Sequence, residues 1–137
     1  KVILTRPALP SISVKPGTGK DMKDRNQIEI DAPRARLVRE AVAYAFNVSP
    51  DEMTAPTRRS SSVAFARQVA MYLAHVSFEL SLTRVAESFG RDRTTAAHAC
   101  HVVEDRRDDP EFDERLDQLE GFLRAVPDPS LDLEITA

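Results

Sequence analysis

The apolar positions of this chain recur at helical spacing. The i, i+3, i+4, i+7 pattern of a helix with one buried face is clearest at Leu82, Val85, Ala86 and Phe89. Comparable patterns predict a helix from Pro33, a helix over about 62–76, and a helix that starts at Asp109-Pro110 and has apolar residues as far as Leu123. The 62–76 pattern is apolar almost all round after Val69, which predicts a central, buried helix. The chain is therefore predicted to be all-α, a bundle of about five to six helices.

A second helix follows the clearest stripe after only three residues, Gly90-Arg91-Asp92. Glycine permits a tight turn, and the Asp92 carboxylate can cap the next helix by accepting a hydrogen bond from the amide of Thr94 or Thr95. Two helices joined by a short turn containing Gly form a helix-turn-helix, whose second helix can enter the major groove of DNA. The sequence thus predicts binding to double-stranded DNA.

This second helix has two chemically different sides. At 100° per residue its apolar side holds Ala96, Ala99, Cys100 and Val103, and the opposite side holds Thr94, His98 and His101. Taken singly, each polar residue is typical of an ordinary solvated surface. Taken together they indicate a DNA-contacting face, and the predicted contact residues are Arg91, Asp92, Arg93, Thr94, Thr95 and His98.

Arg58 and Arg59 lie in a basic, polar loop just before the helix predicted over 62–76. Two arginines in a loop are, by themselves, most simply solvated residues that aid solubility. Their position ahead of the helix-turn-helix favours a different interpretation, in which the loop reaches into the minor groove of the DNA.

Three segments differ in composition. Residues 1–32 are rich in Pro and Gly and predict a flexible arm, residues 33–126 hold the helical domain, and residues 127–137 form an acidic tail. Gly17-Thr18-Gly19-Lys20 superficially resembles a phosphate-binding loop. That motif needs Gly five positions before Gly19 and Ser or Thr after Lys20, where this chain has Val14 and Asp21. No nucleotide site is predicted there.

The net charge of −3 is distributed unevenly along the chain. Residues 1–33 and 34–104 each carry a net charge of +2, whereas residues 105–137 carry −7. The acidity thus lies downstream of the helix-turn-helix, so the overall charge does not argue against DNA binding.

Several motifs occur together between about residues 34 and 107: the run from Ala66 to Ala74, Leu80-Ser81-Leu82, Phe89-Gly90-Arg91-Asp92, Thr94-Thr95 and His98-Ala99. In their order and spacing they resemble the C-terminal DNA-binding domain (domain IV) of the bacterial replication initiator DnaA. The resemblance implies that Arg59 enters the minor groove and that Arg67 and Gln68 contact the DNA backbone. It also implies contacts with base edges or phosphates from Asp92, Thr94, Thr95 and His98.

Three positions depart from that family's usual pattern. The family usually has two glycines before the Arg-Asp pair, where this chain has only Gly90; it usually has His where this chain has Arg93, and Lys where this chain has His75. Because Arg pairs best with O6 and N7 of guanine, Arg93 changes what the helix can read. The resemblance therefore implies DNA binding more strongly than it implies the family's own target sequence.

No residue pattern supports catalysis, so the chain is not predicted to be an enzyme and no cofactor is expected. His98 and His101 could share a metal ion, but no third ligand is apparent and no metal site is predicted. The single cysteine, Cys100, is expected to be a small core residue in a reducing compartment. With no secretory signal or membrane-spanning run, a cytoplasmic, nucleoid-associated protein is expected.

These observations leave three functional hypotheses. The first is a transcription regulator, most simply an activator, that uses a DnaA-like helix-turn-helix without the ATPase module. In this respect the chain resembles stand-alone activators of gene transfer agent clusters, and its acidic C-terminal region would contact RNA polymerase or a second activator. The second is a replication-initiation factor or competitor that binds origin sites. The third is a protein-binding adaptor that has lost DNA binding and uses residues 110–135.

Overall fold

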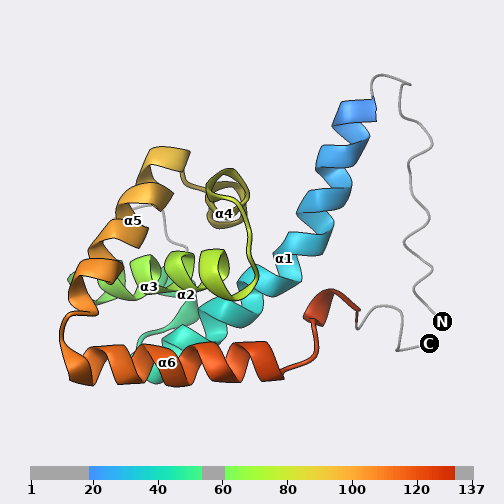
Figure 1. The fold of residues 1–137 in the computed structure, drawn as a ribbon. Coiled ribbons are helices and arrows are strands. Elements are labelled where there is room, and N and C mark those ends of the chain that lie inside the picture. The colour runs from blue at the N-terminus through green and yellow to red at the C-terminus, as the bar shows by residue number, and fades with distance from the viewer. Residues whose placement is uncertain (1–18, 54–60, 132–137) are drawn as a thin grey trace.

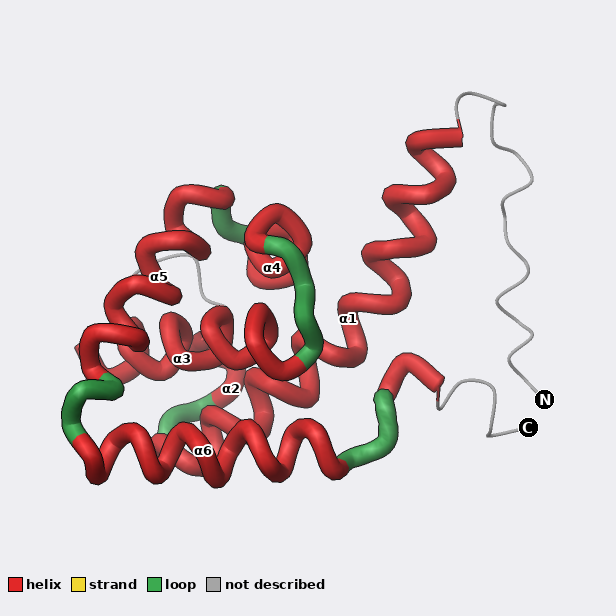
Figure 2. The backbone as a smooth tube through the Cα atoms, in the orientation of Figure 1, coloured by secondary structure: helices red, strands yellow, loops and turns green. Residues whose placement is uncertain are grey.

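The computed structural model describes residues 19–53 and 61–131, and within these ranges it contains helices and no strand (Figure 1, Figure 2). The helices are α1 (Gly19–Phe46), α2 (Pro50–Met53), α3 (Ser61–Ser77), α4 (Leu82–Phe89), α5 (Arg93–Arg106) and α6 (Pro110–Ala125), followed by a short 3-10 helix, η3 (Pro129–Leu131). The predicted all-α bundle is confirmed.

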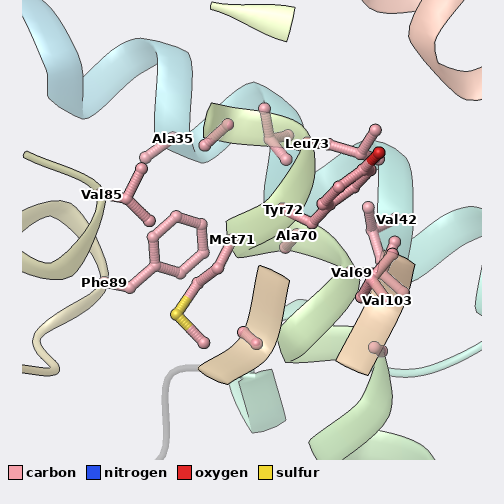
Figure 3. Close-up of a cluster of buried hydrophobic side chains, with 14 of the residues drawn as sticks. Ala35, Val42, Val69, Ala70, Met71, Tyr72, Leu73, Val85, Phe89 and Val103 are labelled. Atoms are coloured by element: carbon pink, nitrogen blue, oxygen red, sulfur yellow. The ribbon is translucent and has the colours of Figure 1, made fainter. Parts of the chain in front are cut away.

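Helix α3 forms the centre of the bundle. Every residue from Val69 to Ala74 is buried, so this stretch is covered on all sides, as its continuous apolar sequence predicts. Figure 3 shows the side chains that surround it, which come from several helices and include Val42 of α1, Val85 and Phe89 of α4, and Val103 of α5. The helix-turn-helix is therefore built on a shared core that also includes α1.

Helix α1 begins earlier than the sequence pattern predicts. The pattern favours a start near Pro33, whereas the helix runs from Gly19 and contains Pro33 in its interior. Residues 19–32 include many straight-chain side chains with good helix propensity but no apolar stripe, so periodicity does not reveal the helix. Its amino-terminal part projects beyond the bundle (Figure 1).

Packed residues are present on both sides of the two predicted domain boundaries. Asp31, assigned to the arm, is only 3% exposed and lies inside the bundle. Asp128, assigned to the tail, accepts hydrogen bonds of 3.1 and 2.6 Å from Nε and Nη2 of Arg34. The packed region thus extends at both ends beyond 33–126, and residues 1–18 and 132–137 lie outside the described residues.

Helix α6 packs back on the bundle and buries Phe112, Leu116 and Leu123. Its acidic side chains are largely gathered around Arg107, which follows α5. The Arg107 guanidinium contacts Asp113, Asp117 and Glu120 and also donates to the Tyr72 hydroxyl at 3.0 Å. Part of the acidity of the C-terminal region is therefore neutralised within the domain.

Candidate nucleic-acid interface

The first helix of the helix-turn-helix, α4, has a defined start and a defined end. The Ser81 hydroxyl caps its start by accepting a 3.2 Å hydrogen bond from the Arg84 amide. At its end, Gly90 takes the left-handed conformation (φ 67°), and the Arg91 amide donates to the Ala86 carbonyl at 2.9 Å. This is the usual way for a helix to end at a glycine, and it turns the chain directly into α5.

The single glycine of this chain is sufficient for the turn. Within the turn from Gly90 to Asp92, only Gly90 has a positive φ. The φ of Arg91 is not positive, and Asp92 is extended (φ −94°). A second glycine is therefore not required by the backbone. The departure from the usual two glycines leaves the helix-turn-helix intact.

Asp92 caps the second helix, α5, as predicted. Its Oδ1 accepts a hydrogen bond of 2.8 Å from the Thr95 amide. Hydrogen bonds from the Thr95 backbone and side chain, with a smaller contribution from the Thr94 amide, lower the pKa of Asp92. The carboxylate is thus ionised at neutral pH, and its exposed position leaves it able to accept from a base amino group.

The two sides of α5 are those that the sequence predicts. Ala96, Ala99 and Val103 are buried against the bundle. The exposed side carries Arg93, Thr94, Thr95, His98 and His101. Contact of these exposed residues with DNA stays a prediction, but their side chains are accessible from the end of α5 that would enter a groove.

Other candidate residues are placed differently. Arg67 is only 9% exposed, and its guanidinium donates to the main-chain carbonyls of Met53 at 2.8 Å and Glu52 at 3.4 Å. It thus fastens α2 to α3, and the contact with the DNA backbone that the resemblance implies stays a prediction. Gln68 and Arg91 are half-buried, and Arg58 and Arg59 lie outside the described residues.

Two further residues position the helix-turn-helix and were not found from the sequence. His75, near the end of α3, hydrogen-bonds through Nδ1 to the Leu80 carbonyl at 2.7 Å, just before α4. Arg84 of α4 pairs with Asp31 of α1, 53 positions away in the chain. Neither contact has a local sequence signal, because each depends on how the helices pack.

Comparison with known proteins now defines the family. The family of bacterial DnaA protein helix-turn-helix domains matches residues 35–103, which include α3, α4 and most of α5 and make up about half of the chain. The chain belongs to this family. Its helix-turn-helix is therefore a DnaA DNA-binding domain, which supports binding to double-stranded DNA.

Two relatives show how much of a DnaA-like protein is present. The chromosomal replication initiator protein DnaA of Symbiobacterium thermophilum is 38% identical over 90 residues, which cover 64% of this chain and 19% of that protein. A crystal structure of a DNA replication initiation factor superposes with a TM-score of 0.63 at 27% identity, covering 75% of this chain and 31% of the other. The chain thus spans less than a third of either relative.

An apolar groove lies between α1 and α6. Helix α6 runs along the edge of the bundle opposite the amino-terminal end of α5 (Figure 1). The volume of the groove is about 650 Å³, and its lining includes Leu37, Ala41, Tyr44, Leu119 and Phe122. Tyr44 is 90% exposed and Phe122 is 52% exposed, which is unusual for large apolar side chains.

None of the described helices is long and apolar enough to cross a membrane.

Proposed function

We propose that this chain is a sequence-specific double-stranded DNA-binding protein that regulates transcription, acting as an activator. The observation that carries the proposal is the exposed face of α5, whose polar side chains surround a capped helix start in a DnaA-type helix-turn-helix. In this function α5 enters the major groove, and the segment that contains Arg58 and Arg59 enters the neighbouring minor groove.

The side chains at the start of α5 divide between reading and positioning. Arg93 is suited to bidentate hydrogen bonding with guanine, and Asp92 to accepting from the amino group of cytosine. Thr94, Thr95 and His98 are suited to base edges or phosphates. Arg91 and Gln68, both half-buried, contact the phosphate backbone and fix the register of the domain.

The base sequence that α5 is expected to recognise favours a regulatory role. Arg93 stands where the family usually has His, so the target of this chain differs from the initiator's own sites. The alternative is a replication-initiation factor or a competitor at origin sites, and the names of both relatives favour it. The two proposals predict the same fold and the same contacts, and they differ in the genomic sites that are occupied.

The C-terminal region provides the protein contacts that an activator needs in addition to DNA binding. We propose that α6 and the residues after it contact RNA polymerase or a second activator, at a distance from the DNA. The groove with Tyr44 and Phe122 supports this proposal, because exposed apolar surface of this kind often marks protein contacts. The protein would then act in the cytoplasm, associated with the nucleoid.

Two measurements test the proposal. In fluorescence anisotropy with random and selected duplexes, neutralisation of about four to six phosphates gives a log–log salt slope of roughly −4 to −5. The absence of binding at low salt would reject DNA binding and leave the adaptor hypothesis. Genome-wide occupancy then separates the roles, since enrichment at promoters supports regulation and enrichment at an origin supports replication control.

A further inference from the structure

Most arginine side chains that the structure describes are held by other groups of the domain. Arg34 and Arg84 form ion pairs with Asp128 and Asp31. Two other arginines of α1, Arg36 and Arg39, differ from these. Within the described part of the chain, neither has an ion pair or a side-chain hydrogen bond, so no carboxylate of the domain neutralises either charge by direct contact.

Arg39 lies beside the turn of the helix-turn-helix. Its Cζ atom is 5.5 Å from the centroid of the Phe89 ring, and Phe89 is the last residue of α4, directly before Gly90. Arg36 precedes Arg39 by three positions on the same helix, so the two side chains are neighbours on its surface. Arg36 is exposed and Arg39 is half-buried. Two positive charges from α1 are thereby placed next to the segment that leads into α5.

This arrangement is electrostatically unfavourable in the free domain. Burial and the neighbouring Arg36 lower the pKa of Arg39, and the nearby acidic group Glu40 only partly opposes them. Arginine nevertheless stays protonated in proteins. The two like charges, which Glu40 only partly offsets, repel each other, and a DNA phosphate bound beside them would reduce this repulsion and release counterions.

We propose that Arg36 and Arg39 form a second phosphate-binding site on α1, which contacts the DNA backbone beside the base pairs that α5 reads. The inference rests on the proposed DNA binding. Phosphate contacts fix orientation and add affinity but carry no direct sequence information. The α1 site therefore increases the affinity and the salt dependence of binding and leaves base preference unchanged.

The test uses the full chain and a duplex selected from a random library, with anisotropy measured over a range of KCl concentrations. The double variant Arg36→Gln/Arg39→Gln loses both phosphate contacts. It should bind roughly tenfold more weakly at moderate salt, and its log–log slope should be smaller by about 2, because each contact contributes about 0.9. Preference among single-base variants of the duplex should not change.

Two further variants separate the phosphate site from loss of charge or loss of folding. Arg36→Gln alone leaves the Phe89 contact in place, and it should reduce the slope by about 1. Arg124→Gln removes the same charge from the exposed face of α6, where the Arg124–Glu120 distance is 3.9 Å, and should leave the slope unchanged.

If the wild-type chain binds DNA, and Arg36→Gln and the double variant bind it with the same affinity and slope, the α1 site is overturned and the proposed function stands. Equal slope losses in Arg36→Gln and Arg124→Gln would also overturn it, since only overall charge would then matter. If the wild-type chain binds no duplex at low salt, the proposed function itself fails, and the inference fails with it.

Discussion

Arg84 of α4 and Asp31 of α1 form a two-point ion pair, with Nε to Oδ2 at 2.9 Å and Nη2 to Oδ1 at 2.8 Å. The Asp31 side chain is almost completely buried, whereas that of Arg84 is about one-third exposed. The pair joins the first helix of the helix-turn-helix to the helix that begins the bundle, so the two helices hold a fixed relative position.

The first prediction concerns this pair. Arg84→Ala removes the main partner of a buried carboxylate and should lower the free energy of unfolding by about 2 kcal/mol, less than for a fully buried pair because Arg84 is partly exposed. Urea denaturation measures the change. Arg93→Ala, at an exposed position of α5, is the control and should change stability by less than about 0.5 kcal/mol. Equal stability of wild type and Arg84→Ala would contradict the proposed importance of the pair.

The second prediction concerns two arginines that are expected to contact different grooves of the DNA. Arg93→Ala should relax preference at one or two guanine positions, a loss of about 1–3 kcal/mol of discrimination. Arg59→Ala should instead weaken binding at an A·T-rich flank, because minor-groove contacts respond to groove width. A panel of single-base duplex variants distinguishes them. Uniform loss across the panel for both variants would mean that both residues contact only phosphate.

The third prediction is a pH dependence at the C-terminal end of the domain. The hydrogen bonds from Arg34 lower the pKa of Asp128 to about 2, below the value near 4 of an unfolded carboxyl. A lowered native pKa stabilises the fold above pH 4, and this stability is lost as the pH falls from 4 towards 2. Asp128→Asn should therefore cost about 1 kcal/mol at pH 7, since the pair is partly exposed, and much less at pH 2.

Glu114→Gln is the matched control for Asp128→Asn, because Glu114 is an exposed carboxylate without an ion pair among the described residues. Unfolding by urea at several pH values compares the two variants with wild type. A stability difference for Asp128→Asn that stays constant from pH 7 to pH 2 would show that Arg34 does not depend on the ionised carboxylate.

The fourth prediction concerns Cys100, which is half-buried on α5. Burial, with a smaller contribution from Glu104, raises the pKa of the thiol to about 11. The thiol is therefore almost entirely protonated at pH 8, and only the thiolate is reactive. Iodoacetamide should label the native protein at least tenfold more slowly than the urea-unfolded protein. Equal rates in the two states would contradict this prediction.

The sequence predicts the helix-turn-helix well because its signals are local. The apolar stripe ending at Phe89, the glycine turn and the Asp92 cap all act within a few residues, and each has the predicted role in the structure. The packing of α6 is also predicted, since its leucines recur at helical spacing. Local patterns are thus enough to place the candidate reading face on the exposed side of α5.

The remaining features depend on contacts between distant residues. Asp31 lies in a segment without apolar periodicity, and the cost of burying its carboxylate is offset by Arg84, 53 positions later, which pairs with it. Arg34 and Asp128 are 94 positions apart. The family resemblance implies a DNA contact for Arg67, and it gives no sign that the guanidinium also donates to the carbonyls of Met53 and Glu52 in α2. A sequence pattern does not show which charged residues will form hydrogen bonds or ion pairs inside the folded domain.

Helix α1 has a mechanical consequence for the domain. Its 28 residues correspond to about 42 Å measured along the helix axis, and the contacts of Asp31 and Arg34 hold it near its middle. One half is embedded in the bundle, and the other half extends beyond it (Figure 1). Because the Asp31–Arg84 pair joins α1 directly to α4, the projecting half has a fixed direction relative to the helix-turn-helix.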